Sequence, residues 1–186
     1  MHALLEMIDA VNKQVTFLME RMHSLMEEHQ DELFIKQIGL LQTITGVGFL
    51  SAVTIMCEIG DFSCFRNPKQ LFAYFGLDPT VRQSGKFNAT DVHMSKRGSK
   101  TARRALFAVA LASIRSNRHS IPLNPILMDY YKKKCESKAK MVAIGAIMHK
   151  VCNIIFAILR DGKPFVLINP EEHCLNYREM VLLKTA

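Results

Sequence analysis

The sequence lacks the paired cysteines that would indicate a disulfide framework or a zinc site. Five cysteines are present, an odd number with no short paired spacing: Cys57, Cys64, Cys135, Cys152 and Cys174. Because most of them lie among apolar residues, we expect reduced thiols in the core of a cytoplasmic protein. The histidines lack the i,i+4 or Cys-x-x-Cys spacing of zinc ligands, which favours structural or solvent-facing roles.

A secretory leader and a long unbroken apolar run are also missing. Acids begin at Glu6, and no basic segment followed by an apolar one precedes them, so we expect no signal peptide. The longest apolar run, residues 141–159, is broken by His149 and Lys150. A buried helix is therefore favoured over a membrane span, and we expect no membrane partner.

Acidic residues are scarce around the basic second half of the chain. The nearest ones, Glu58, Asp61, Asp78 and Asp91, include no pair whose spacing demands a shared metal ion. We therefore expect no metal site in this chain and exclude a self-contained metal nuclease.

Basic residues are present in excess, 24 Lys and Arg against 17 Asp and Glu, with the acids concentrated before Asp61 and the bases after Lys86. This asymmetry predicts a polyanionic partner for the second half. The alternative is a basic surface with no committed partner. With 186 residues, nearly half of them apolar, the chain can bury a core.

The first 38 residues follow a heptad pattern with no Gly or Pro before Gly39. Apolar residues step by four and three positions: Leu4, Ile8, Val11, Val15, Leu18, Met22 and Leu25. The pattern predicts a coiled coil or long amphipathic arm over residues 1–38, which would join protomers into a homo-oligomer. The alternative is a helix packed on its own domain.

A second unit, residues 39–168, opens with a predicted helix-hairpin-helix around Gly46, Val47 and Gly48. Glycines on either side of Val47 allow a tight turn whose N–H groups can bind a phosphate backbone at a helix N-terminus. A plain helix–helix turn remains the alternative.

Further helices are predicted from capping residues and apolar periodicity, and the fold class is mainly α. Asn67 and Pro68 start a short helix that Gly76 ends, and others run from Lys100, over about 125–136, and over 138–160. Residues 81–87 and 88–93 could form one small β-hairpin. The tail, residues 169–186, suggests a short appended helix.

Ser84 differs from an ordinary loop serine because Gly85 follows it and Arg82 and Lys86 flank it. The cations could stabilise a charged phosphoryl transition state, but no base that would take the serine proton is visible. From these residues alone Ser84 is either a nucleophile or a serine that contacts phosphate.

Ser99 precedes a helical run and is predicted to be its N-cap, and Ser95 could do likewise. The adjoining cations are predicted to contact phosphate: Lys96, Arg97, Lys100, Arg103 and Arg104. Arg103 and Arg104 cannot both face the core, so at least one should be free for this contact.

Several motifs in sequence order together resemble one family: "ITGVG", "EIGDFSCF", "AYFGLDP", "QSGK" and "RGSKTARRAL". Over about residues 40–165 the chain is similar to the C-terminal domain of insertion-sequence 110/1111 transposases, relatives of Piv-type site-specific invertases. The resemblance implies a bacterial or archaeal DNA recombinase in which Ser84 forms a covalent phosphoserine link to DNA. It also implies a structured guide RNA, a coiled coil between protomers, and Mg²⁺ held by four acids of an N-terminal RNase H-like domain.

The sequence departs from that pattern because we expect no acidic RNase H-like domain within this chain, and Thr45 stands where the hairpin often carries proline. We therefore expect weak or no strand transfer by this polypeptide alone, whether it is a truncated gene or a fragment. Two other classes remain open: a non-catalytic, dimerising helix-hairpin-helix module that binds nucleic acid, and an interaction protein whose charge is incidental. Steep salt dependence of binding would separate the last from the others.

Overall fold

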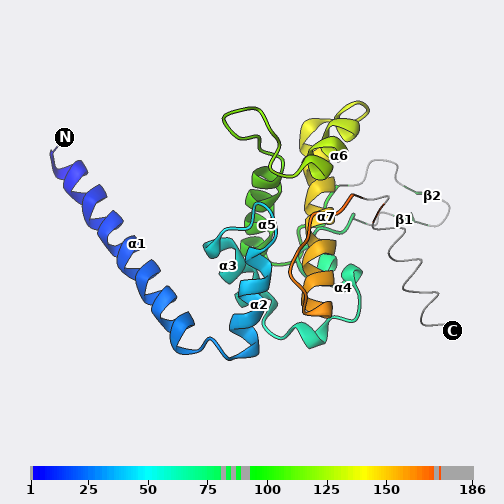
Figure 1. Ribbon diagram of the computed structural model, residues 1–186. Helices are drawn as coiled ribbons and strands as arrows, with labels where there is room; N and C mark the ends of the chain where they lie inside the picture. The colour runs from blue at the N-terminus through cyan, green and yellow to red at the C-terminus, as the bar shows by residue number, and fades with distance from the viewer. Residues whose placement is uncertain (1, 81–82, 85–86, 89–92, 170–171, 173–186) are drawn as a thin grey trace. The chain divides into compact units, whose positions relative to one another are not determined.

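The computed structural model describes residues 2–80, 83–84, 87–88, 93–169 and 172. The chain folds as two compact units, Met1–Gln37 and Ile38–Ala186. Helices dominate both units, which confirms the predicted fold class. Figure 1 shows the helices in chain order.

The first unit contains the helix α1, His2–Glu28, and the start of α2, Leu33–Gln42. No residue of α1 is buried, and several of its apolar side chains, among them Leu4, Val11 and Leu18, are more than half exposed. The arm is thus not one continuous helix, because residues 29–32 form turns in which Glu32 N–H donates to His29 O at 3.0 Å. His and Asp are weak helix formers, so Gly or Pro is not needed to end α1 here.

The second unit contains the remaining helices and two short strands. Their bounds are α3 Phe49–Ile59, the 3₁₀ helix η1 Phe62–Cys64, α4 Pro68–Tyr74, β1 Gln83–Ser84, β2 Phe87–Asn88, α5 Lys100–Ser113, α6 Pro125–Cys135 and α7 Lys140–Asp161. The strands β1 and β2 pair antiparallel, with Gln83 opposite Asn88 and Ser84 opposite Phe87. The hairpin was predicted, but its pairing lies earlier in the chain than the expected reversal between residues 87 and 88.

Helix α7 forms the centre of the second unit and packs against α4, α5 and α6. Its side chains Ile147, Val151 and Ile155 are fully buried, together with Leu106 of α5. By length and composition alone α7 could cross a membrane, but 56% of its most apolar window is buried inside the protein. This burial agrees with the predicted core helix.

Side-chain caps set the helix starts where the sequence placed them. Asn67 Oδ1 accepts from Gln70 N–H at 3.1 Å, Ser99 Oγ from Ala102 N–H at 3.0 Å, and Asn124 Oδ1 from Leu127 N–H at 3.0 Å. Each cap satisfies an N–H group that the first helical turn leaves without a backbone acceptor. Gly162, in the left-handed region at φ 62°, ends α7.

Two sequence predictions need correction or fall outside the described residues. Among the described cysteines only Cys152 is buried, whereas Cys57 and Cys64 are exposed and Cys135 is half-buried, so most are not core thiols. Apolar neighbours in sequence do not decide which face of a helix a side chain occupies. Of the tail, only residues 169 and 172 are described, so the predicted terminal helix lies outside the described residues.

Candidate functional site

Three of the sequence motifs meet in one cluster of hydrogen bonds at the N-terminus of α5. Ser99 Oγ donates to Glu58 Oε2 at 2.6 Å while it also caps α5, and Tyr74 Oη donates to Glu58 O at 2.7 Å. Glu58 lies near the end of α3 and Tyr74 ends α4, so one carboxylate and one carbonyl tie three helices together. We call Glu58, Tyr74, Gly76, Gly98 and Ser99 the motif cluster.

Two glycines of the motif cluster allow two segments of backbone to cross closely. Gly76 has φ +66°, and a Cβ there would lie 2.6 Å from Gly98 N and 2.9 Å from Arg97 N. A Cβ on Gly98 would collide with Tyr74 O and Gly76 N. Ser99 N–H donates to Tyr74 O at 3.1 Å across this crossing. Only glycine fits both positions, which explains "FGLDP" and "KRGSK" in structural terms.

The crossing continues into the base of the hairpin that carries Ser84. Ser95 N–H donates to Asp78 O at 2.8 Å, and Thr80 N–H donates to His93 O at 2.7 Å. Ser95 Oγ donates to Asp78 Oδ1 at 2.6 Å, so Ser95 closes the base of the hairpin and does not cap a helix. The backbone on both sides of residues 81–92 is thus fixed by hydrogen bonds.

Ser84 is the last residue of β1, opposite Phe87 of β2. The hairpin connects the two hydrogen-bonded arms that leave the motif cluster. Arg82 and Lys86, the predicted cationic neighbours of Ser84, lie outside the described residues.

The other predicted cations fall into two groups. Lys96, Arg97, Lys100 and Arg104 reach solvent. Arg103 is half-buried, and its Nη1 donates to Phe75 O at 2.9 Å and to Gly98 O at 3.4 Å. Arg103 therefore helps to hold the crossing together, and Arg104 is the exposed member of the pair.

The turn around Gly46 has one side packed against α5 and one side open to solvent. Gly46 has φ +94°, and a Cβ there would lie 2.7 Å from Ser113 Oγ, while Val47 is only 7% exposed. Gly48 is exposed and is the N-cap of α3, with no side-chain cap. A ligand at this turn would therefore meet backbone N–H groups rather than the Val47 side chain.

A groove of about 350 Å³ runs between α3 and α5, and Arg104 lines it. Hydroxyl groups of Ser51 and Thr101 lie along the same groove, as does that of Thr54, which donates to Leu50 O at 2.7 Å. Hydroxyls and a guanidinium together are a common set of donors to phosphate oxygens. The groove begins near the predicted helix-hairpin-helix turn, because Leu50 and Ser51 belong to the first turn of α3.

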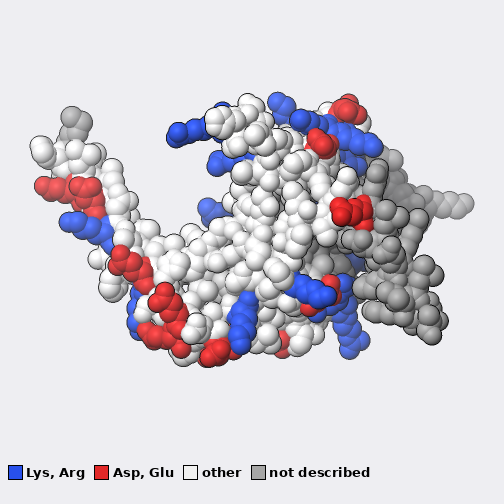
Figure 2. All heavy atoms as spheres, viewed as in Figure 1, with Lys and Arg blue, Asp and Glu red and all other residues white. Residues whose placement is uncertain are grey.

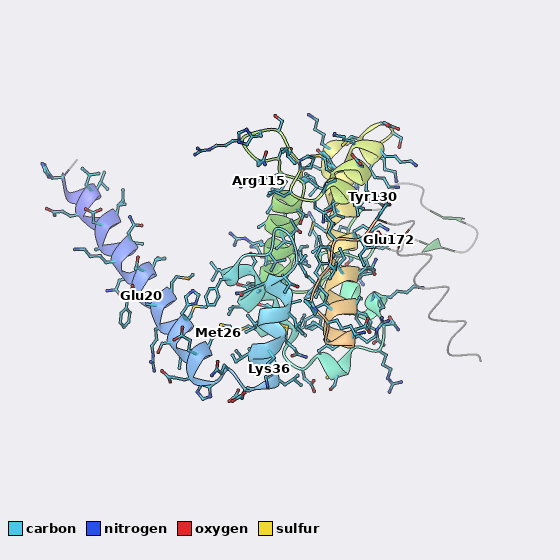
Figure 3. The ribbon with its side chains drawn as sticks, in the orientation of Figure 1. Glu20, Met26, Lys36, Arg115, Tyr130 and Glu172 are labelled. Atoms are coloured by element: carbon cyan, nitrogen blue, oxygen red, sulfur yellow. The ribbon has the colours of Figure 1, made fainter. Side chains whose placement is uncertain are left out.

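A second basic region was missed by the sequence reasoning. Residues 115–150 contain eight Lys and Arg but only two acids, Asp129 and Glu136. Figure 2 shows these cations over α6 and the loop before it, and Figure 3 marks Arg115 and Tyr130 at this end. Nζ atoms of Lys134 and Lys150 lie 5.3 and 5.1 Å from the centre of the Tyr130 ring. The three consecutive lysines at 132–134 could have indicated this region from the sequence.

The described residues do not offer a site for a divalent metal. Within that part of the chain, no three His, Cys, Asp or Glu side chains come close enough to hold one. Glu58 and Asp78 are hydrogen-bonded to serines, and Asp61 accepts from Ser63 Oγ and N–H, which lowers the Asp61 pKa. These acids serve local structure.

Comparison with known proteins finds relatives among gene-inverting and insertion-element proteins. A pilin gene-inverting protein of Moraxella bovis is 33% identical over 128 residues, which are 68% of this chain and 38% of the relative. An uncharacterized 43.6 kDa protein of insertion element IS110 from Streptomyces coelicolor is 26% identical over 156 residues, 83% of this chain and 35% of the relative. The transposase of insertion sequence IS1111A from Coxiella burnetii is 30% identical over 119 residues, 64% of this chain and 32% of the relative.

Two of these relatives are thus a gene-inverting protein and a transposase. The model of the transposase IS116/IS110/IS902 family matches residues 39–131, half of the chain, and the chain belongs to this family. The chain spans about a third of the length of the curated relatives it matches.

Proposed function

We propose that this chain is the serine-bearing part of a DNA recombinase and that Ser84 is its nucleophile. In this reaction Ser84 Oγ forms a bond to a DNA phosphorus while one phosphorus–oxygen bond to deoxyribose breaks. The serine loses its proton, and the departing sugar oxygen takes one up. Attack on the same phosphorus by the hydroxyl of another strand then releases the serine and joins the new strands.

The observation that carries this proposal is the anchoring of the hairpin. Hydrogen bonds of Asp78, Thr80 and Ser95 fix both arms, and the motif cluster holds those arms against α5. A nucleophile needs a defined position relative to its phosphate, and a rigid scaffold below a functional loop supplies one. The polar structure at the base of this hairpin is what such a scaffold requires.

We propose that the DNA backbone follows the exposed cations of α5 and the groove beside it. Arg104 and Lys100 would contact phosphates by charge, with Thr101 and Ser51 as hydrogen-bond donors. The predicted contacts at Gly46, Val47 and Gly48 would then come from backbone N–H groups at the start of α3. Arg82, Lys86, Lys96 and Arg97 would complete the predicted phosphate contacts. Arg103, whose Nη1 is taken up by two backbone carbonyls, would contact phosphate through its remaining N–H groups.

Three partners complete the proposed enzyme. The exposed apolar seam of α1 would pair with the same seam of a second copy, because burial of such a seam is what stabilises a coiled coil. A structured guide RNA would select the DNA, so that sequence choice need not lie in side chains. Carboxylates that hold Mg²⁺ would belong to a separate acidic domain, in a cytoplasmic assembly.

A covalent-capture assay tests the nucleophile. The chain is mixed with a separately expressed acidic domain from a relative, guide RNA and nicked DNA, and protein–DNA adducts are resolved under denaturing conditions. An adduct should form with the wild type and with Ser63→Ala, a control at an exposed serine whose hydroxyl donates to Asp61. The adduct should be absent with Ser84→Ala, and its persistence in that variant refutes the assignment.

The second candidate function is a nucleic-acid-binding module without chemistry. The basic region over α6 favours it, since those cations lie apart from the motif cluster along the chain. If no adduct forms under any condition but DNA binding stays steeply dependent on salt, this second function is the correct one.

A further inference from the structure

A cavity of about 380 Å³ lies between α5, α7 and the arm after the hairpin, and the proposed chemistry does not use it. Its apolar lining comes from Met94, Phe107, Met141, Ile144 and Met148. We call it the methionine pocket. Its size falls within the range of about 300–1,000 Å³ that is usual for small-molecule sites.

Gly145 keeps the methionine pocket open. It lies inside α7, where glycine lowers helix stability relative to alanine, and its φ is not in the left-handed region. A Cβ at Gly145 would meet no atom within 4 Å. Neither backbone conformation nor close packing therefore explains the glycine. A side chain there would project into the pocket that Gly145 lines.

The pocket is cationic at its edge. Lys96, Arg103 and Arg104 line it together with the apolar residues, and no acid among the described residues does. Lys96 has φ +55°, a left-handed conformation that is uncommon for residues other than glycine, and its N–H donates to Gly76 O at 3.1 Å. Backbone strain of this kind is found where a side chain must be held in a particular place.

An apolar floor with a cationic edge fits a group that is flat, apolar on its faces and attached to phosphate. We propose that the methionine pocket receives one unpaired nucleobase of a DNA strand whose flanking phosphates contact Lys96 and Arg104. Phe107 offers an aromatic surface and the methionines offer polarisable ones, both of which attract a base. This inference rests on the proposed function, that the chain binds DNA.

The pocket is also connected to the hairpin of Ser84. Met94, one of its lining residues, is bridged to Pro79 at the base of that hairpin. Strand exchange separates base pairs near the reacting phosphate, so unpaired bases are available there. Holding one of them would keep the opened strand from pairing again.

The test compares two DNA duplexes that differ only by one extra, bulged nucleotide, at one salt concentration. The wild-type chain should bind the bulged duplex about tenfold more tightly, since stacking of a base on protein aromatics gives an advantage of this order. A bulge that carries an abasic site should lose the preference. The same comparison with paired and bulged RNA duplexes tests whether the pocket prefers RNA.

Gly145→Leu fills the pocket with a good helix former, and Gly39→Leu is the matched control. Gly39 also lies inside a helix with no atom within 4 Å of a Cβ, and it does not line the pocket. Gly145→Leu should abolish the preference for the bulge while affinity for the paired duplex stays unchanged, and Gly39→Leu should keep both. Urea unfolding of each variant shows that the fold is retained.

Four outcomes overturn the proposal. No preference for the bulge in the wild type, or a preference that survives Gly145→Leu, leaves the pocket to another occupant, such as an acidic peptide. A preference confined to the RNA duplex assigns it to RNA. Failure to bind any DNA refutes the proposed function itself, so the two failures are distinguishable.

Discussion

The glycine crossing in the motif cluster predicts a graded series of stabilities. Gly162 has φ +62° with open space around it, Gly98 has no positive φ but collides with backbone, and Gly76 has both features. Three alanine substitutions therefore separate backbone strain from steric overlap. Gly145→Ala, with neither feature, is the control.

The magnitudes follow from these contacts. Left-handed backbone should cost Gly162→Ala about 1 kcal/mol of unfolding free energy. Overlap with backbone atoms that cannot turn away should cost Gly98→Ala about 3 kcal/mol, at the upper end of overpacking effects. Gly76→Ala combines both and should cost about 4 kcal/mol, whereas Gly145→Ala should gain about 0.5–1 kcal/mol because alanine is the better helix former.

Urea unfolding of the full chain measures the series. With a slope of about 2 kcal/mol per molar, the midpoint should fall by about 0.5 M for Gly162→Ala, 1.5 M for Gly98→Ala and 2 M for Gly76→Ala. The reasoning is refuted if Gly98→Ala unfolds within about 0.5 M of the wild type. It is refuted equally if Gly162→Ala costs as much as Gly98→Ala, because strain and overlap would then not be separable.

Three further predictions test the cap, the buried thiol and the arm. Ser99→Ala should lower the unfolding free energy by about 1–2 kcal/mol, since it removes the α5 cap and the partner of Glu58, and a double-mutant cycle with Glu58→Ala should show coupling. Cys152 should resist a thiol reagent in the folded protein while exposed Cys57 reacts at once. Burial raises the Cys152 pKa, so above its ordinary value of 9.0 the unfolded chain loses a proton that the folded chain keeps. Stability should then fall by up to about 1.4 kcal/mol per pH unit more steeply than in Cys152→Ala, as unfolding curves between about pH 9 and 11 would show. Val11→Asp, which places a charge in the α1 seam, should weaken the proposed association of two copies through α1 in sedimentation experiments, whereas Glu20→Asp at an exposed acid should not.

The helix starts were predictable because their signals are local. Asn67 with Pro68, and Ser99 before Lys100, satisfy N–H groups only three positions away, so a few letters of sequence contain the whole interaction. The ends of the arm were not predictable in this way. No Gly or Pro marks the turns of residues 29–32, and helix propensities differ too little between ordinary residues to place such a break.

The motif cluster could not be derived from spacing. Ser99 and Glu58 stand 41 positions apart, and His149 Nε2 reaches Leu77 O at 3.0 Å across 72 positions. Only the packing of α3, α4, α5 and α7 brings such groups together. The sequence motifs contained the residues of the cluster, but Glu58 and Asp78 were interpreted only as acids near a basic region. In the structure each of them accepts a hydrogen bond from a serine.

The structural roles of Glu58 and Asp78 bear on which part of the proposed enzyme would supply its catalytic carboxylates. A carboxylate that accepts a hydrogen bond at 2.6 Å and lies within a crossing of backbone segments is positioned for structure, not for exchange of metal ligands. Since Asp78 bonds to Ser95 and Glu58 to Ser99, both acids hold the backbone from which the hairpin extends, and in the proposed reaction this chain would contribute position and positive charge. In the proposed reaction, activation of Ser84 would then come from groups outside the motif cluster. Glu58→Gln makes this argument testable, because an amide oxygen can still accept from Ser99. If Glu58 serves structure alone, adduct formation at Ser84 should survive that substitution and fail with Glu58→Ala, which leaves Ser99 without its acceptor.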